Sequence, residues 1–174
     1  LVRDQKVGPV HGRVHTSVML AEVLEAFEPQ AGMLLVDATA GEGGHSEALL
    51  RAHKKTQVRA LDADLRSVTL ASERLASFGA RAQVVEANFG DVAKVLKKQK
   101  IKEVAGVLFD LGWNSGQLTS ERGFSFMHDE PLLMTYGKKS ASGFTAREAL
   151  NEWDEETLSN VFFGYGEERY ARRI

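Results

Sequence analysis

The chain has 174 residues, of which 43% are apolar and 26% are charged, and its formal net charge is −2 at pH 7. This length and composition predict one ordinary folded domain, or one domain with part of another, and exclude a largely disordered chain. Because the sequence holds no cysteine, disulfides, zinc–thiolate sites and a cysteine nucleophile are excluded. The small negative charge argues mildly against broad nonspecific binding of nucleic acid, although a local basic patch would still allow it.

Neither a membrane span nor a metal site is expected. No apolar run approaches the roughly 20 residues that a spanning helix needs, and the first residues lack the apolar core of a secretory signal. His11 and His15 are four residues apart, but they lie in a segment with glycine and proline and have no helix to align them. We therefore expect a cytoplasmic protein.

The first predicted elements are a leader and a helix. Residues 1–14 show no sustained periodicity and contain glycine and proline, which predicts a loose leader. A helix is predicted from Thr16 or Ser17 as N-cap up to Pro29. Its apolar residues recur at helical spacing and would pack on a sheet: Leu20, Val23, Leu24 and Phe27.

Residues 34–46 (LLVDATAGEGGHS) predict a strand, a glycine-rich loop and the start of a helix. The strand ends in Asp37, and Gly41, Gly43 and Gly44 follow it. Glycine lets backbone N–H groups approach a ligand closely, because no Cβ intervenes and positive φ costs little. The pattern is typical of a nucleotide-binding loop, and a tight turn in an ordinary α/β domain is the alternative.

Asp62 ends the next predicted strand, residues 57–61, and lies twenty-one positions after Gly41. An acid at this place is suited to accept hydrogen bonds from a ribose diol, so the cofactor should contain a nucleoside. A dinucleotide site would follow G-x-G-x-x-G/A, and Ser46 stands where the third glycine belongs. The sequence therefore favours S-adenosylmethionine, whose amino-acid end needs no pyrophosphate cradle, over NAD.

The predicted helix after Asp62 is capped by Asp64 and ended by Gly79. Its buried face is expected to consist of Leu65, Val68, Ser72 and Leu75. A third strand is predicted over residues 82–86. Because ligands bind at the carboxyl ends of the strands of a doubly wound sheet, Phe89 in the next loop is a candidate to lie against a purine ring; the alternative is that it packs in the core.

A lysine-rich helix is predicted from Asp91 to about Lys100. It indicates a solvated surface, and contact with nucleic acid is the alternative. The fourth strand, residues 104–110, is nearly continuous in apolar residues, as expected of a central parallel strand, and it ends in Asp110.

The segment after Asp110 changes in character. About thirty residues rich in glycine, hydroxyl and aromatic side chains follow, and a loop of this length is usually functional or disordered. Thr145, Asp154 and Gly166 are then expected to begin three short helices, which would be the start of a helical subdomain.

Six motifs occur in the order and spacing of one protein family: DATAGEGGHS, ALDAD, ANF, FDLGWNSGQL, RGFSFM and YGEERYARRI. With HTSVML near the start, the chain resembles the ribosomal RNA small subunit methyltransferase H family, also called MraW, from His15 to Ile174. The resemblance implies an α/β, Rossmann-like class I S-adenosylmethionine-dependent methyltransferase over residues 15–143, with an incomplete sheet. It further implies that residues 144–174 begin an inserted helical subdomain.

The resemblance also implies the reaction and the binding residues. The reaction is methylation of the exocyclic N4 amine of one cytidine in 16S rRNA, with small-subunit RNA or the small subunit as partner. Carried over by position, seven residues would bind the cofactor: Gly43, Gly44, His45, Asp62, Phe89, Asp110 and Gln117.

Cytosine is a difficult acceptor, because the lone pair of its amine is delocalised into the ring. A hydrogen-bond acceptor at the end of the fourth strand would draw on the N–H as the new bond forms, in the manner of a general base. Asp110 and Asn114 are the candidate catalytic residues at that place.

The acceptor base must be unstacked to be reached, which fits RNA loops. Candidate stacking surfaces are Trp113, Phe124, Phe126 and Tyr136. The alternative for the two phenylalanines is a hydrophobic plug that closes the cofactor pocket. Arg122 is expected to meet either a phosphate or the acid of a surface salt bridge.

The chain departs from the usual family motifs DLGxSSPQLD and GPLDMRM in the segment expected to meet substrate. The six positions are Asn114, Gly116, Thr119, Leu133, Thr135 and Tyr136. Because an acid and a base are lost there, a non-catalytic or specificity-drifted homologue that binds S-adenosylmethionine or RNA is the alternative function. The fourth strand would be an unpaired edge, which favours an N-terminal fragment of a longer protein.

Overall fold

The computed structural model describes residues 17–113, 115–118, 120–137 and 143–174. The predicted leader, with His11 and His15, and Thr16 lie outside these ranges. Among the described residues, no helix is both long enough and apolar enough to cross a membrane.

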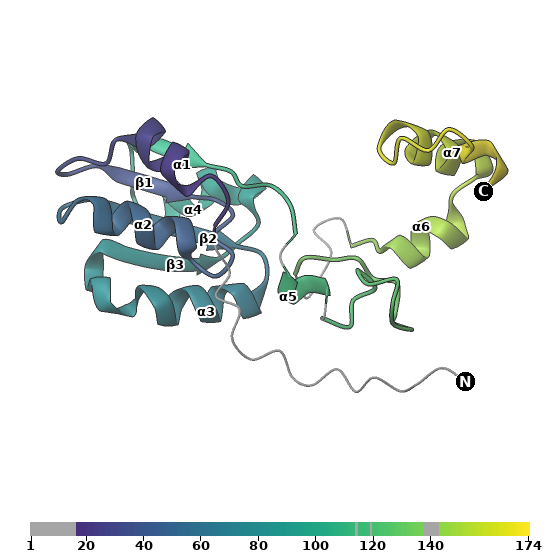
Figure 1. Cartoon of the computed structure of the whole chain (residues 1–174), viewed down its shortest axis with the longest axis horizontal. Coiled ribbons are helices and arrows are strands. Elements are labelled where there is room, and N and C mark those ends of the chain that lie inside the picture. Colours follow the sequence, from purple (N-terminus) through teal and green to yellow (C-terminus); the bar gives the residue numbers. More distant parts are fainter. Residues whose placement is uncertain (1–16, 114, 119, 138–142) are drawn as a thin grey trace.

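Four parallel strands form one sheet in the order β3-β2-β1-β4 (Figure 1). They are β1 Leu34–Asp37, β2 Gln57–Asp62, β3 Ala82–Glu86 and β4 Gly106–Leu108. Asp37 at the end of β1 pairs with Ala60 and Leu108, so three strands end near one another. The chain runs outward from β1 to β3 and returns to β4 on the other side of β1, which creates a topological switch point there. The predicted doubly wound α/β fold is confirmed.

Helices cover both faces of this sheet. Three helices pack on one face, namely α1 Leu20–Phe27, α2 Gly44–Ala52 and α3 Leu65–Leu75, and α4 Val92–Lys98 packs on the other (Figure 1). The first interface is filled by a cluster that includes Leu35 and Val58, and the second by a smaller cluster around Val36 and Leu61. Successive residues of β1 therefore face opposite layers, and the strand is buried on both sides.

α1 begins later than the sequence predicts. Its N-cap is Met19, which has a left-handed backbone (φ 53°) and no side-chain cap bond. The hydroxyl of Ser17 is turned instead toward Gly44, where an added Cβ would overlap it. At the other end of α1, a Cβ added to Gly106 of β4 would lie only 2.6 Å from a carbon of the Phe27 ring. Glycine at that position lets α1 lie close to the sheet.

The predicted face of α3 is confirmed at Leu75 and wrong at Leu65 and Ser72, and the predicted N-cap is confirmed. Asp64 accepts a hydrogen bond from the Arg66 N–H at 3.1 Å. The side chains that are buried are Ser67, Ala71 and Leu75, whereas Leu65 and Ser72 are exposed. Small residues face inward because the glycine loop after β1 lies against this helix. The helix continues into a 3-10 segment, Ala76–Arg81, in which Gly79 has φ 56°.

β4 is shorter than predicted and lies at the edge of the sheet. Within the described ranges it pairs with β1 alone, and its residues are only partly buried. Residues 104–110 have the apolar sequence of a central strand. However, only Gly106–Leu108 form hydrogen-bonded pairs with β1, so the strand is limited to these residues.

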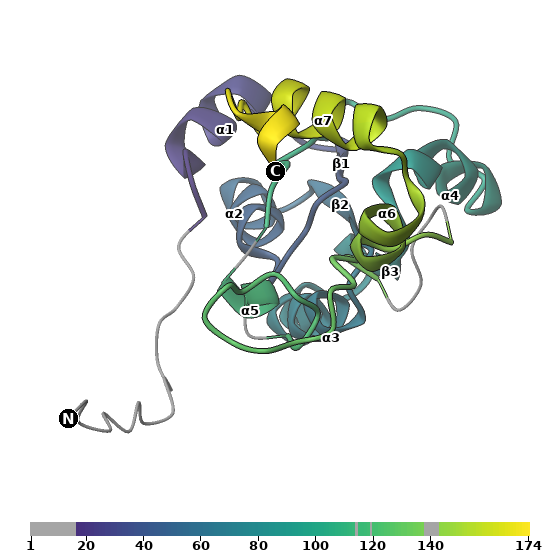
Figure 2. The ribbon, with the colours of Figure 1, turned by 90° about the vertical axis from the view of Figure 1, so that its right-hand side faces the viewer.

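The remaining elements follow the long segment after β4. They are α5 Ser115–Leu118, α6 Ala146–Glu152, α7 Glu155–Gly164 and a 3-10 turn, Ala171–Arg173. The predicted caps Thr145 and Asp154 are confirmed, the first as a capping box with Glu148. Figure 2 shows α5, α6 and α7 in front of the strands, on the side where the chain leaves the sheet.

The third helix predicted to start at Gly166 is wrong. The N–H groups of Gly166 and Glu168 both donate to the Phe162 carbonyl, at 3.1 Å each, and Glu167 has φ 53°. These bonds close the end of α7, so that only a 3-10 turn follows.

Candidate functional site

A cavity of about 440 Å³ lies at the carboxyl ends of the strands. Its walls come from the loop after β1, the turn after β2, the loop after β3 and the segment after β4. They include six of the seven residues predicted to bind a cofactor: Gly44, His45, Asp62, Phe89, Asp110 and Gln117. Gly43 is not part of the wall. The structure therefore brings together residues that lie up to 73 positions apart (Gly44 to Gln117) at the switch point of the sheet.

The glycine loop between β1 and α2 adopts backbone conformations that favour glycine. Gly41 has φ 53°, and Gly43, the N-cap of α2, has φ 83°. A Cβ on Gly43 would lie 3.3 Å from the Cα and Cβ of Ala71 in α3. Gly43 thus serves the close packing of the loop on α3, while Gly41 and Gly44 face the cavity.

Asp62 joins the glycine loop to the turn after β2. One carboxylate oxygen accepts from the Gly41 N–H and the other from the Asp64 N–H, both at 2.8 Å. Burial raises the pKa of the Asp62 carboxyl above its ordinary value, and the hydrogen bonds from the two backbone N–H groups lower it. Since each carboxylate oxygen accepts more than one bond, the group can still receive two hydroxyls from the cavity.

The Asp37–Ser46 pair was not predicted. The Ser46 hydroxyl donates to Asp37 at 2.7 Å, and both side chains are fully buried. Burial raises the pKa of the Asp37 carboxyl, while the hydrogen bond from Ser46 lowers it. Ser46, which breaks the dinucleotide pattern, therefore fixes the start of α2 on the end of β1. A hydroxyl in the first turn of a helix after a strand that ends in an acid is the sequence signal for this contact.

His45 and Asp110 meet at the wall of the cavity. His45 is 6% exposed, and its Nε2 lies 3.4 Å from Asp110 Oδ2. Its Nδ1 is buried and has no hydrogen-bond partner among the described residues. The Asp110 side chain is half exposed, and its backbone N–H donates to the Thr39 hydroxyl at 2.6 Å. Of these polar groups, the half-exposed Asp110 carboxylate is the one that a ligand in the cavity can reach.

The aromatic side chains divide into two groups. Phe89 is 46% exposed at the cavity, where its ring meets Phe109 edge to face at 6.1 Å, so the core-packing alternative is wrong. Phe124 is buried between the rings of Trp113 and Tyr136, at 6.4 and 5.6 Å. Phe126 is 96% exposed, which excludes it from a hydrophobic plug. Trp113 and Tyr136 line the cavity themselves.

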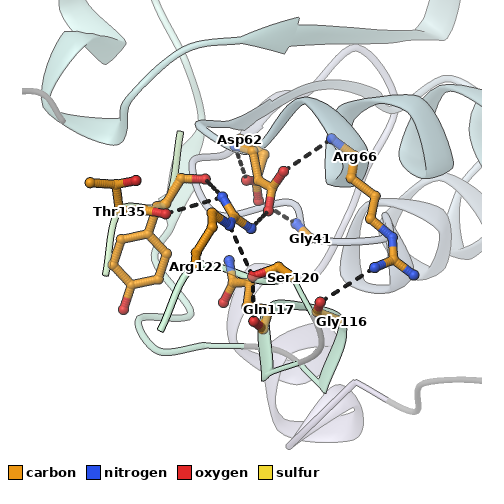
Figure 3. Close-up of polar contacts among 10 residues, drawn as sticks. Gly41, Asp62, Arg66, Gly116, Gln117, Ser120, Arg122 and Thr135 are labelled. Atoms are coloured by element: carbon orange, nitrogen blue, oxygen red, sulfur yellow. Dashed lines mark hydrogen bonds and ion pairs between the residues drawn. The ribbon is translucent and has the colours of Figure 1, made fainter. Parts of the chain in front are cut away.

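Arg122 forms a salt bridge and is not a free phosphate ligand. Its Nη2 lies 2.5 Å from Asp64 Oδ2, and both side chains are mostly buried (Figure 3). Gln117, on α5 nearby, is buried and lines the cavity. Asn114, the second candidate catalytic residue, lies outside the described residues.

A second cavity of about 870 Å³ adjoins the first and shares Ala63, Asn88 and Tyr136 with it. Its far wall comes from α6 and the residues before it, where the rings of Phe144 and Trp153 stack at 5.1 Å. Within the described ranges, no group of three or more histidine, aspartate or glutamate side chains is arranged to hold a metal ion.

Comparison with known proteins agrees with the motifs. The model of the MraW methylase family matches residues 12–174. The chain is 44% identical to the ribosomal RNA small subunit methyltransferase H of Syntrophotalea carbinolica, over 92% of this chain and 51% of that protein. Proteins of the same name from Geotalea uraniireducens and Thermotoga neapolitana are 41% and 40% identical, over 92% of this chain and 51% and 53% of their own length. The chain spans about half the length of these relatives, and it belongs to the MraW methylase family.

Proposed function

We propose that the protein transfers a methyl group from S-adenosylmethionine to the N4 amine of a cytidine in small-subunit ribosomal RNA, in the cytoplasm. The observation that carries the proposal is the cavity at the strand ends, which is lined by Asp62, the glycine loop and His45. The names of the relatives support ribosomal RNA as the substrate class.

The residues of the cavity fit the parts of this cofactor. Asp62 would accept the ribose hydroxyls, and the exposed ring of Phe89 would lie beside the adenine. The amino-acid end would lie over the glycine loop and the start of α2, near His45. Asp110 and Gln117 would complete the site from the side of β4. The volume of about 440 Å³ is of the size of small-molecule sites, about 300–1,000 Å³.

The bound cofactor supplies an activated methyl carbon, so the protein has to hold the acceptor in line and exclude water. Asp110 is the group placed to accept a hydrogen bond from the amine. Its carboxylate is half exposed at the cavity with His45 Nε2 at 3.4 Å, and its backbone N–H donates to the Thr39 hydroxyl. Replacing Asp110 by asparagine should lower turnover by about 100-fold or more, and turnover left intact with cofactor affinity retained would contradict this role.

The acceptor would arrive from the second cavity, which shares Tyr136 with the first. An unstacked cytosine can lie against exposed aromatic rings there, and base stacking on such rings is tolerant of the base. Tyr136 lines both cavities and Trp113 lines the first, and these are the rings we assign to this contact. The exposed Phe126 would meet a neighbouring nucleotide.

The departures from the family motifs favour one second candidate, a homologue that binds S-adenosylmethionine or RNA without turnover. Thr135 and Tyr136 replace an arginine and a methionine. Their backbone carbonyls accept hydrogen bonds from Arg122, and these bonds do not depend on the side chains at the two positions.

A labelling experiment separates the two candidates. The protein is incubated with S-adenosylmethionine carrying a labelled methyl group and with small-subunit RNA or isolated subunits, and the RNA is digested to nucleosides. We expect the label in N4-methylcytidine. Cofactor binding without any labelled nucleoside would favour the second candidate, and label in another nucleoside would contradict the proposed acceptor.

A further inference from the structure

Arg122 contacts four residues that belong to two different parts of the chain. Nε donates to Ser120 Oγ at 2.9 Å, Nη1 to the carbonyls of Thr135 and Tyr136 at 3.1 and 2.6 Å, and Nη2 to Asp64 Oδ2 at 2.5 Å. The guanidinium side chain is 17% exposed. Figure 3 shows it between the turn after β2 and the segment that follows β4.

The Asp64 side of this contact leads directly to the cofactor cavity. Asp64 accepts from Arg122 with one oxygen and from the Arg66 N–H with the other, and its own N–H donates to Asp62 at 2.8 Å. Asp62 lines the cavity and is the residue proposed to hold the ribose. A displacement of the Asp62 side chain would therefore be passed to Arg122 through Asp64, whose N–H binds Asp62 and whose carboxylate binds the guanidinium.

The other side leads back to the same cavity. Arg122 fixes the backbone at Thr135 and Tyr136, and its own carbonyl accepts from the Met134 N–H at 2.7 Å. The Tyr136 side chain lines both cavities, and its ring packs on Phe124, over which the guanidinium lies at 5.9 Å. The contacts form a continuous chain from Asp62 through Asp64 and Arg122 to Tyr136, and both of its ends line the first cavity.

Arginine is the residue type that this position needs. A planar guanidinium has five donors at fixed angles and can meet a carboxylate and two carbonyls at once, whereas a lysine presents one compact charge. Among the other described arginines, Arg66 also reaches the segment, but from the surface and through one bond of 3.3 Å to the Gly116 carbonyl (Figure 3).

We propose that Arg122 is a positioning residue through which an occupied cofactor cavity orders residues 120–136, the wall that faces the acceptor base. This inference rests on the proposed function, because it needs a ligand at Asp62. It predicts that a ligand bound to Asp62 reduces the motion of the turn at residues 62–64. The salt bridge from Asp64 then restrains Arg122, and the hydrogen bonds of Arg122 restrain the backbone at Thr135 and Tyr136.

Hydrogen exchange followed by mass spectrometry tests the coupling without measuring turnover. The chain is compared alone and saturated with S-adenosylhomocysteine, which has the same nucleoside and amino-acid groups but no methyl to transfer. In the wild-type chain we expect the ligand to slow exchange about five- to tenfold both in the glycine loop and in residues 120–136.

Arg122→Ala separates the two regions. The ligand should still slow the glycine loop, with an affinity within about threefold of the wild type, but it should no longer slow residues 120–136. Arg122→Lys keeps the positive charge opposite Asp64 but loses the planar set of donors, so we expect the ligand to slow exchange in residues 120–136 by an intermediate factor. If the alanine variant does not fold, the lysine variant decides. Arg51→Ala is the matched control, because Arg51 pairs with Glu47 on the exposed side of α2, and it should behave as the wild type.

Each other result contradicts a specific claim. Ligand-dependent slowing of residues 120–136 that survives in Arg122→Ala and Arg122→Lys would overturn the inference, as would a wild-type chain in which the ligand protects only the glycine loop. Failure of the ligand to bind the wild-type chain would overturn the proposed cofactor, and the inference with it.

Discussion

Asp62 is the single side chain on which cofactor affinity should depend most. Its carboxylate would form charge-assisted bonds with both ribose hydroxyls, and each such bond is worth about 1.5–3 kcal/mol. We therefore expect Asp62→Asn to raise the dissociation constant for S-adenosylmethionine about 10- to 100-fold, as measured by calorimetric titration.

A matched control distinguishes a ligand contact from a general effect of charge. Asp91 is the N-cap residue of α4 and pairs with Lys94 on the surface, and it does not line the first cavity. Asp91→Asn should leave the dissociation constant unchanged. Equal affinity of the Asp62 variant and the wild type would remove Asp62 from the binding site.

The buried Asp37 carboxyl makes stability depend on pH. Burial raises its pKa above the ordinary value of 3.8. A group that binds its proton more tightly in the folded chain contributes stability that is fully present below the unfolded pKa and is lost as pH rises through the folded pKa. The free energy of unfolding of the wild type, relative to that of Asp37→Asn, should therefore fall as pH rises above 3.8.

Urea unfolding at a series of pH values measures this difference. Ser46→Ala supplies a second test, because it removes the hydrogen bond that lowers the pKa of Asp37 and should therefore extend the decline in stability to higher pH. A relative stability that is constant or that rises over the same range would show that Asp37 is not a buried acid with a raised pKa.

Local residue patterns predicted some of these contacts and not others. The spacing of Gly41 and Asp62 identified an acid opposite the glycine loop, and their hydrogen bond of 2.8 Å confirms that they meet. The salt bridge between Asp64 and Arg122 joins residues 58 positions apart and depends on how the long segment returns to the sheet. No periodicity in the sequence carries that information, so only the two alternatives for Arg122 could be stated.

At the scale of elements, the contact between the glycine loop and α3 determines how closely the start of α2 can approach α3. Gly43 and Gly32 have the same backbone conformation, φ 83° and 82°, but a Cβ on Gly32 would meet nothing within 4 Å. Both alanine variants pay for the strained backbone, about 1–2 kcal/mol, and only Gly43→Ala also presses on Ala71, for about 1–3 kcal/mol more. Denaturant unfolding should show this difference, and equal losses would mean that the loop does not pack on α3.

Three helix caps were predictable, whereas the start of α1 and the buried face of α3 were not. Asp64, Thr145 and Asp154 cap the helices that they were expected to cap, because capping is chemistry between residues two or three positions apart. The predicted face of α3 was partly wrong, since close packing of the glycine loop selects Ser67 and Ala71 over the more apolar Leu65. Tertiary packing outweighed hydrophobicity at that place.

At the scale of the whole molecule, two parts of the chain meet at the cavity of about 440 Å³. The sheet with α1 to α4 supplies the glycine loop, Asp62 and Phe89, and the chain after β4 supplies Asp110, Gln117 and Tyr136 (Figure 1). The β1 and β4 ends belong to the switch point of the sheet, so the parallel fold alone determines where the cavity lies. The shape of the outer wall depends on the long segment, whose composition predicted a functional loop but not its path.

A crystal structure of the chain with S-adenosylhomocysteine tests the central claim most directly. We expect the ribose hydroxyls within hydrogen-bond distance of the Asp62 carboxylate, the adenine beside Phe89 and the sulfur facing Asp110. A ligand seated away from the ends of β1, β2 and β4, or a sugar far from Asp62, would contradict it.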